Sequence, residues 1–136
     1  MILSIDPGSD KSGIAIYDPE NGAVILHQVI LTEGFSECLA KFLSSYPIDY
    51  FLLGDGTFSK RFSEQLKKLA PEYPIMLIDE AYSTLEARNL YFQLYPPCGW
   101  RRIIPVSMQT PEKPFDDLVA VVLLKRYLGE MPKICR

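Results

Sequence analysis

Three apolar runs open the chain, and short links with strong turn signals join them. The runs are Ile2–Ile5, Gly13–Tyr17 and Ala23–Leu31, and Pro-Gly and Asn-Gly signals separate them. Proline and glycine punctuate strands in this way, and short links join antiparallel neighbours. The first 31 residues therefore predict a three-strand antiparallel meander, and every later element must add to that sheet.

After the meander, segments with apolar residues at helical spacing alternate with short segments that are apolar throughout. Continuous apolar runs bounded by turns are typical of buried parallel strands, and strand–helix–strand units imply right-handed crossovers. The segment Ser83–Glu86 fits a capping box at the start of the helix predicted at Thr84–Leu94. The predicted elements are a helix at Phe35–Leu43, a strand at Asp49–Leu53, a helix at Phe58–Leu69, a strand at Ile75–Ile78, and helices at Thr84–Leu94 and Phe115–Leu128.

This order predicts an α/β fold with a five-stranded mixed sheet flanked by helices. The 136 residues form a single domain, 1–136, since no repeat or linker divides them. The segment between Pro96 and Pro114 has little periodicity and is expected to be a long loop.

Composition excludes several classes of protein. One histidine, His27, rules out a histidine pair or triad, and we expect it to be a strand residue with a satisfied ring. Three cysteines without C-x-x-C spacing predict reduced thiols rather than a disulfide framework or a zinc site. No apolar stretch is long enough for a membrane helix, and the first residues lack the pattern of a signal peptide, so we expect a cytoplasmic protein.

Acidic residues follow the ends of two predicted strands and open the last helix. Asp6 ends the first strand, Asp79-Glu80 follows the fifth, and Asp116-Asp117 begins the final helix. Each has an ordinary alternative as a turn residue, a cap or a complement to a helix dipole. In an open α/β sheet, however, ligands gather at the carboxyl ends of the strands. Carboxylates brought together there would repel, and Mg²⁺ or Mn²⁺ would relieve the repulsion.

Several segments resemble a known family. Ile5–Ala15 resembles the opening of the RuvC and YqgF branches of the RNase H-like superfamily. Asp79–Arg88 is similar to the YqgF signature, and Asp116–Leu128 is similar to the family's final helix. Gly54–Thr57 resembles a Gly-Asn-Gly-Thr turn in the related domain of Tex transcription accessory proteins. The principal segments occur in the family's order and span nearly the whole chain.

The resemblance implies an RNase H-like fold and a nuclease that uses Mg²⁺ or Mn²⁺, with a two-metal site expected. Asp6, Glu80 and Asp116 match the family's metal-binding carboxylates, and Asp117 is a neighbour that could take the same role. Members include Holliday-junction resolvases and the nuclease that matures pre-16S rRNA. The expected partner is therefore nucleic acid, as branched DNA or structured RNA, and a symmetric junction would suit a homodimer.

One departure from the family pattern concerns the residue after Asp79-Glu80. The family usually has arginine there, whereas this chain has Ala81, and Arg88 is a candidate substitute.

Trp100 could stack on a base, or it could anchor the loop against the domain, the second being favoured. The residues expected to contact substrate are Lys11, Thr57, Lys60, Arg88, Arg101 and Arg102.

Three functions remain open from the sequence. The first is a metal-dependent endonuclease for structured nucleic acid. The second is a nucleic-acid-binding module with weak or no activity, similar to the Tex domain. The third, a sugar-kinase or actin-like ATPase fragment, needs two such domains and a second phosphate loop, which a chain of 136 residues without a repeat lacks.

Overall fold

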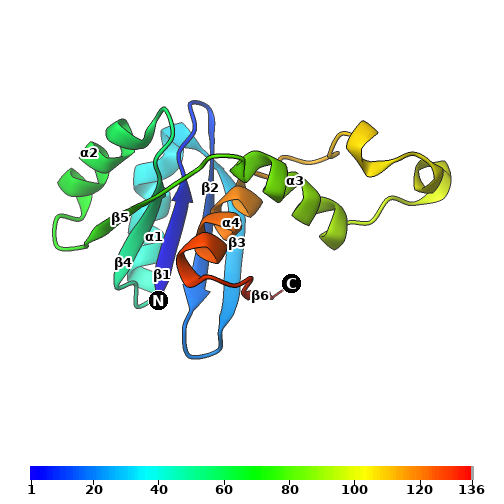
Figure 1. The fold of residues 1–136 in the computed structure, drawn as a ribbon. Helices are drawn as coiled ribbons and strands as arrows, with labels where there is room; N and C mark the ends of the chain where they lie inside the picture. Colours follow the sequence, from blue (N-terminus) through cyan, green and yellow to red (C-terminus); the bar gives the residue numbers. More distant parts are fainter. Residues whose placement is uncertain (136) are drawn as a thin grey trace.

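A six-stranded mixed sheet forms the middle of the computed structural model, which describes residues 1–135 (Figure 1). The strand order is β5-β4-β1-β2-β3-β6. β1, β2 and β3 pair antiparallel, whereas β4, β5 and β6 join the sheet in parallel pairs. The strands are β1 Ile2–Asp6, β2 Lys11–Asp18, β3 Ala23–Leu31, β4 Tyr50–Gly54, β5 Ile75–Ile78 and β6 Lys133–Ile134.

The predicted meander and the two later strands are confirmed, but the predicted strand count of five is wrong. β6 is a two-residue strand in which Lys133 and Ile134 pair with Ala23 and Val24 of β3. The backbone N–H of Cys135 extends the pairing by donating to Val24 O at 2.9 Å. A strand this short has no periodicity to detect, so only tertiary contact reveals it.

Helices cover both faces of the sheet. α1 (Phe35–Ser45) and α2 (Ser59–Leu69) pack on one face, and α3 (Ser83–Leu94) and α4 (Asp116–Leu128) pack together on the other (Figure 1). Alternate residues of β1 serve the two cores: Leu3 and Ile5 face α1 and α2, while Ile2 faces α4. This period-two burial explains why the strands have continuous apolar sequences.

α4 is fixed against β1 and β2 along its length. Its residues from Leu118 to Leu124 are all buried. The buried hydroxyl of Ser4 on β1 donates to the Ala120 carbonyl at 2.7 Å. Gly13 of β2 lies directly against the backbone of Asp116, and Gly13 pairs with Asp6 across the β1–β2 ladder. The first turn of α4 is therefore held beside the carboxyl end of β1.

Residues 95–115, which we call the arm, project from the body of the domain between α3 and α4 (Figure 1). The arm contains two short 3₁₀ turns, Gly99–Ile103 and Val106–Met108. Trp100 is 72% exposed, so the expectation that it anchors the loop against the domain is wrong. Ile103 and Met108 are exposed as well, and Arg88 of α3 instead holds the arm by hydrogen bonds to its backbone.

The start of α3 also differs from expectation. Ser83 is the first helical residue rather than the cap, and Tyr82 precedes it in the left-handed region with φ 61°. No side chain caps this helix. The capping-box prediction is therefore wrong, because Glu86 turns away from the helix start to bind Lys125 and Arg126.

Three further features concern membrane helices, the cysteines and the histidine. No helix within residues 1–135 combines the length and apolarity that crossing a membrane requires. The three cysteines are free thiols. The ring of His27 is satisfied, since its Nδ1 lies 2.6 Å from Asp117 Oδ2.

The close approach of β2 to α4 makes Gly13 a sensitive position. A Cβ at residue 13 would overlap the carbonyl of Asp116, so we expect Gly13→Ala to lower the free energy of unfolding by about 1–3 kcal/mol, as overpacking does. Urea denaturation measures the change. Gly34→Ala is the matched control, because nothing lies within 4 Å of its added Cβ and its φ of −92° suits alanine. Equal effects of the two substitutions would contradict this packing.

Candidate active site

Three carboxylates from distant parts of the sequence meet at one edge of the sheet. Asp6 is the last residue of β1, Glu80 follows β5, and Asp116 is the first residue of α4. β1, β4 and β5 are parallel, so their carboxyl ends lie at the same edge. Glu80 and Asp116 line one surface hollow together, and Asp6 and Asp116 line an adjoining one.

Glu80 is held in place by the turn that follows β4. A Cβ on either Gly54 or Gly56 would overlap the Glu80 carboxylate, so both positions must lack a side chain. Asp55 lies between them, and its Oδ1 accepts a hydrogen bond from the Glu80 backbone N–H at 3.0 Å. The turn that resembles the Tex domain therefore serves as a cradle for Glu80.

The three acids perturb one another's protonation. Burial, then the charge and hydrogen bonding of Glu80, and then the charge of Asp116 raise the pKa of Asp6 to about 8. Burial raises the pKa of Glu80, which the neighbouring Asp6 and the Gly56 backbone N–H partly oppose. Burial also raises the pKa of Asp116, and Lys11 opposes this rise. An extra positive charge at this site would therefore be strongly favoured.

The donor set fits a hard divalent cation. All three side chains offer oxygen ligands, which Mg²⁺ and Mn²⁺ prefer. Oε1 of Glu80 is buried and has no hydrogen-bond donor among residues 1–135, so an acceptor there lacks a partner. Within this range, no three acidic, histidine or cysteine side chains stand at the mutual spacing of metal ligands. The carboxyl groups of Asp6 and Glu80 interact directly, and Glu80 is held in its glycine cradle, so the three acids would have to shift to share a cation.

Asp116 and Asp117 point to different places. Asp116 lines both hollows beside Asp6 and Glu80. Asp117 accepts from the Leu118 backbone N–H at 3.0 Å and lies 2.6 Å from His27 Nδ1 on β3. Both carboxylate oxygens of Asp117 are thus engaged away from Asp6. This arrangement supports Asp116 over Asp117 as the third acid.

The residues expected to contact substrate divide into two groups. Lys11 lines both hollows, and Thr57 lines the one that contains Glu80. The others line neither: Lys60 is exposed at the start of α2, Arg102 is exposed on the arm, and Arg101 is paired with Glu112. Only the first group lies next to the carboxylates.

Arg88 does not occupy the place of the arginine that Ala81 replaces. Its Nη2 donates to the backbone carbonyls of Val106, Ser107 and Gln109, so it fastens the arm to α3. The guanidinium also lies over the ring of Phe92, 5.5 Å from the centroid. The suggestion that Arg88 substitutes for the missing cation is therefore wrong in this structure.

A different cation, Arg126 of α4, lies against the backbone of this segment. It donates to the Asp79 carbonyl at 2.6 Å and the Ala81 carbonyl at 2.5 Å, and it pairs with Glu86 at 2.9 Å. Its charge lowers the pKa of Glu80. Sequence reasoning missed Arg126 and Asp55 as residues that position Glu80; the only signals were a basic pair at the end of α4 and the Gly-Asp-Gly turn.

The raised pKa of Asp6 predicts a specific dependence of stability on pH. Folded Asp6 holds its proton up to about pH 8, whereas an unfolded aspartate loses it near pH 3.8, so this group lowers stability as pH rises between those values. Without divalent cations, Asp6→Asn should therefore be more stable than wild type at pH 8, by about 1 kcal/mol or more. The difference should vanish below pH 3.8.

Thermal unfolding in EDTA across this pH range measures the effect, and exposed Glu72→Gln is the control. Added Mn²⁺ should stabilise wild type but not Asp6→Asn. A wild type that gains stability toward pH 8 in EDTA, relative to Asp6→Asn, would contradict the raised pKa of Asp6.

Comparison with known proteins supports the predicted resemblance. No family model matches the sequence. The chain is 25% identical over 143 residues to a curated protein of Azobacteroides pseudotrichonymphae genomovar. CFP2 named "Putative pre-16S rRNA nuclease", covering 97% of this chain and 98% of that protein.

Solved structures share the fold. The Fowlpox virus resolvase, solved with substrate Holliday junction DNA, matches with a TM-score of 0.54 at 14% identity over 94% of both chains. Thermus thermophilus RuvC matches with a TM-score of 0.54 at 10% identity, covering 96% of this chain and 98% of that one. The chain therefore has the RuvC-like RNase H fold, and its likeness to the YqgF and RuvC branches of the RNase H-like superfamily is confirmed.

Proposed function

We propose that this protein is a metal-dependent endonuclease that cuts structured nucleic acid, either branched DNA or structured RNA. The observation that carries the proposal is the crowding of Asp6 by Glu80 and Asp116 at the carboxyl end of β1. The curated relative is named as a nuclease for pre-16S rRNA, and a structural neighbour was solved with Holliday junction DNA. Both names fit a phosphodiester substrate.

The three acids have separate roles in this proposal. Asp6 and Asp116 line a common hollow and would hold a cation between them. Glu80 would contribute Oε1, the buried oxygen that lacks a donor. Mg²⁺ or Mn²⁺ bound there would neutralise charge on the scissile phosphate and activate a water. The proposal includes either Mg²⁺ or Mn²⁺ as the metal, and a pair of ions at the site.

Lys11 and Thr57 would bind the substrate beside the metal. Lys11 lies at the start of β2 and lines both hollows, so its ammonium can contact a phosphate placed over Asp116. Thr57 faces the hollow that contains Glu80 and offers a hydroxyl donor. These contacts would orient the phosphodiester for in-line attack.

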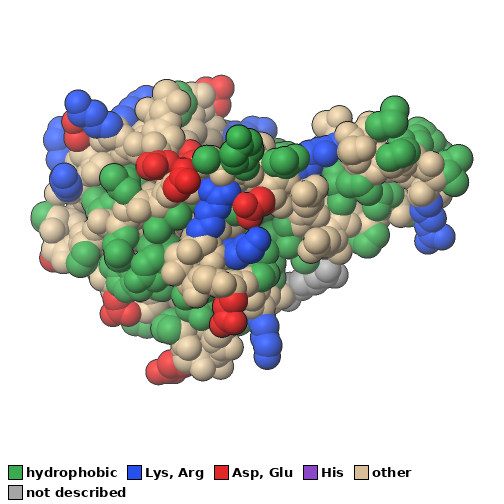
Figure 2. Space-filling view, viewed as in Figure 1, with side chains coloured by type: hydrophobic (Ala, Val, Ile, Leu, Met, Phe, Trp, Pro, Cys, Tyr) green, Lys and Arg blue, Asp and Glu red, His purple; other side chains and the backbone are tan. Residues whose placement is uncertain are grey.

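Cations farther away would bind the rest of the nucleic acid. Arg102 is exposed on the arm beside Trp100, and Lys60 is exposed on α2. Figure 2 shows exposed hydrophobic side chains along the arm, where Ile103 and Met108 are 86% and 76% exposed. A tryptophan flanked by arginines can stack on a base while the arginines neutralise phosphates.

Two further expectations belong to the same proposal. A homodimer would match the symmetry of a four-way junction, and the exposed apolar arm offers surface for one. A cytoplasmic location would suit free thiols such as Cys98 and Cys135, which are exposed.

A nucleic-acid-binding module without activity is the second candidate. Ala81 in place of the family's arginine and the Tex-like turn at Gly54–Thr57 favour it. Arg126 weighs against it, because this cation lies at the backbone of Asp79 and Ala81 and keeps a positive charge near Glu80. The two candidates differ in whether bound substrate is cut.

We expect cleavage of a four-way DNA junction or a structured pre-rRNA fragment in Mn²⁺, with none in EDTA. Asp6→Asn and Asp116→Asn should each reduce the cleavage rate by about 100-fold or more, because losing a metal ligand removes several kcal/mol of transition-state stabilisation. Gel assays with end-labelled substrates measure the rates.

Asp117→Asn is the matched control for Asp116→Asn. The amide keeps the size of the side chain and an oxygen for the Leu118 N–H, so its rate should stay within about tenfold of wild type. Salt-sensitive binding by wild type without any cleavage would favour the binding module instead.

A further inference from the structure

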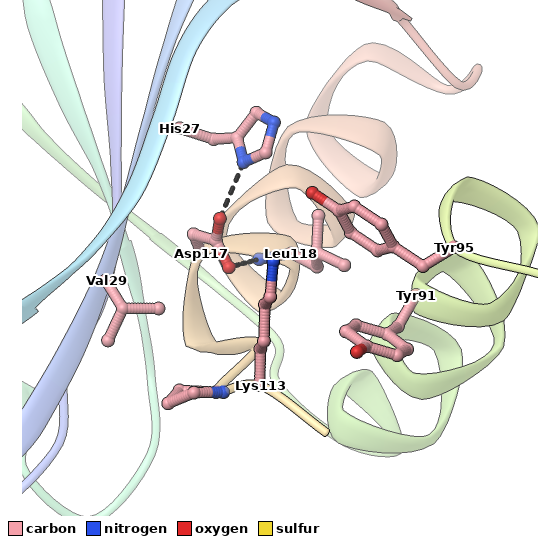
Figure 3. A pocket seen from close by; sticks show the side chains of 8 residues that line it. His27, Val29, Tyr91, Tyr95, Lys113, Asp117 and Leu118 are labelled. Atoms are coloured by element: carbon pink, nitrogen blue, oxygen red, sulfur yellow. Dashed lines mark hydrogen bonds and ion pairs between the residues drawn. The ribbon is translucent and has the colours of Figure 1, made fainter. Parts of the chain in front are cut away.

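A second cavity lies on the other side of the first turn of α4 from the carboxylates. It has a volume of about 300 Å³, at the lower end of the range for small-ligand pockets. β3 contributes His27 and Val29 to its lining, α3 contributes Tyr91, and Tyr95 follows the end of α3 (Figure 3). Lys113 and Pro114 of the arm and Asp117 and Leu118 of the first turn of α4 supply the rest.

The cavity offers an aromatic face and a cation close together. Tyr95 is 49% exposed, and its ring lies 5.1 Å from that of Tyr91, which is buried. Lys113 Nζ lies 5.7 Å from the centre of the Tyr95 ring. Lys113 is exposed and forms no ion pair with the described residues. A ligand with a flat ring and a negative charge could stack on Tyr95 and pair with Lys113.

His27 adds a fixed hydrogen-bonding group. The side chains of His27 and Asp117 are only 16% and 14% exposed, and the two are joined at 2.6 Å (Figure 3). Because the Asp117 carboxylate accepts, Nδ1 of His27 carries the donated proton. Nε2 of the neutral ring is then an acceptor for an N–H or O–H of a ligand. The ring is therefore held in one orientation by a carboxylate that has no other role in the proposed chemistry.

The cavity adjoins the proposed active site. Lys113 and Pro114 line it, and the same two residues line the hollow that contains Asp6, Lys11 and Asp116. Asp116 and Asp117 are consecutive residues that face these two spaces. A strand bound with a phosphate at Asp116 could place an adjoining nucleotide at Tyr95 without leaving the surface.

We propose that this cavity binds one unstacked nucleotide of the substrate strand. Tyr95 would stack on the base, Lys113 would bind a phosphate, and His27 would accept a hydrogen bond from a base amine or a sugar hydroxyl. The inference rests on the proposed nuclease function and narrows its substrate class. The preferred strand would have an unpaired nucleotide next to the cut, since a base within a continuous duplex cannot enter the cavity.

Binding is tested on the full-length Asp6→Asn protein in EDTA, so that cleavage plays no part. Adenosine and uridine 5′-monophosphates are titrated while backbone amide resonances are followed by NMR, with the nucleosides and inorganic phosphate as separate probes. We expect saturable binding of the monophosphates, with shifts at Tyr95, Lys113 and His27. Tyr95→Ala and Lys113→Ala should each weaken binding about tenfold, the effect of losing one stacking or charged contact.

Two controls are matched to these variants. Tyr95→Phe keeps the ring, and Lys41→Ala removes an exposed lysine from α1 on the opposite face of the sheet, so both should bind within about twofold of the parent. Binding by Tyr95→Ala and Lys113→Ala that is as tight as that of the parent protein, or binding that inorganic phosphate alone reproduces, would overturn the proposal. So would an absence of saturable binding.

A second measurement separates this inference from the nuclease proposal. Wild type in Mn²⁺ is given a duplex and the same duplex with one unpaired nucleotide. We expect faster cleavage of the second, and Tyr95→Ala should remove the preference. Nucleotide binding without any cleavage would sink the nuclease proposal alone, whereas cleavage without a preference would sink the subsite alone.

Discussion

The contact between the backbone of Asp116 and Gly13 is the constraint on which the site depends. Gly13 pairs with Asp6 in the β1–β2 ladder, so a helix packed on Gly13 brings its first carboxylate beside Asp6. The buried hydrogen bond from Ser4 to the Ala120 carbonyl fixes how far α4 can slide along β1. Packing of an apolar helix thus offsets the cost of burying these acids and crowding them together, a cost visible in the raised pKa of Asp6.

Much of the fold could be predicted because its determinants are local. The turns after Ile5 and Tyr17 set the meander, and Ala23–Leu31 and Ile75–Ile78 have the predicted bounds. The parallel strands followed from continuous apolar runs, and the direction of the chain then placed Asp6 and Glu80 at one edge. The positions that prediction missed depend on tertiary contacts: β6 exists only through its pairing with β3, and the start of α3 is set by Glu86 bonding to α4.

The candidate site shows the same division. Spacing and resemblance indicated which acids to consider, but not the orientation of Asp117, which His27 of β3 fixes from 90 residues away. Nor could they show that Arg126 lies at the backbone of Ala81, or that Gly54 and Gly56 make room for the Glu80 carboxylate. Arg88 had a suitable type and spacing, yet the arm's carbonyls engage it. Whether an arginine can bind substrate depends on which groups surround it in the fold, and sequence spacing does not show those neighbours.

A crystal of the protein soaked in Mn²⁺ tests the central claim most directly. Anomalous scattering locates manganese without reference to the protein coordinates. The account predicts peaks between Asp6 and Asp116, with Glu80 moved from its glycine cradle to ligand distance of about 2.1 Å. Manganese bound elsewhere, or no manganese near these carboxylates at a saturating concentration, would contradict the proposal that their crowding serves to hold a metal.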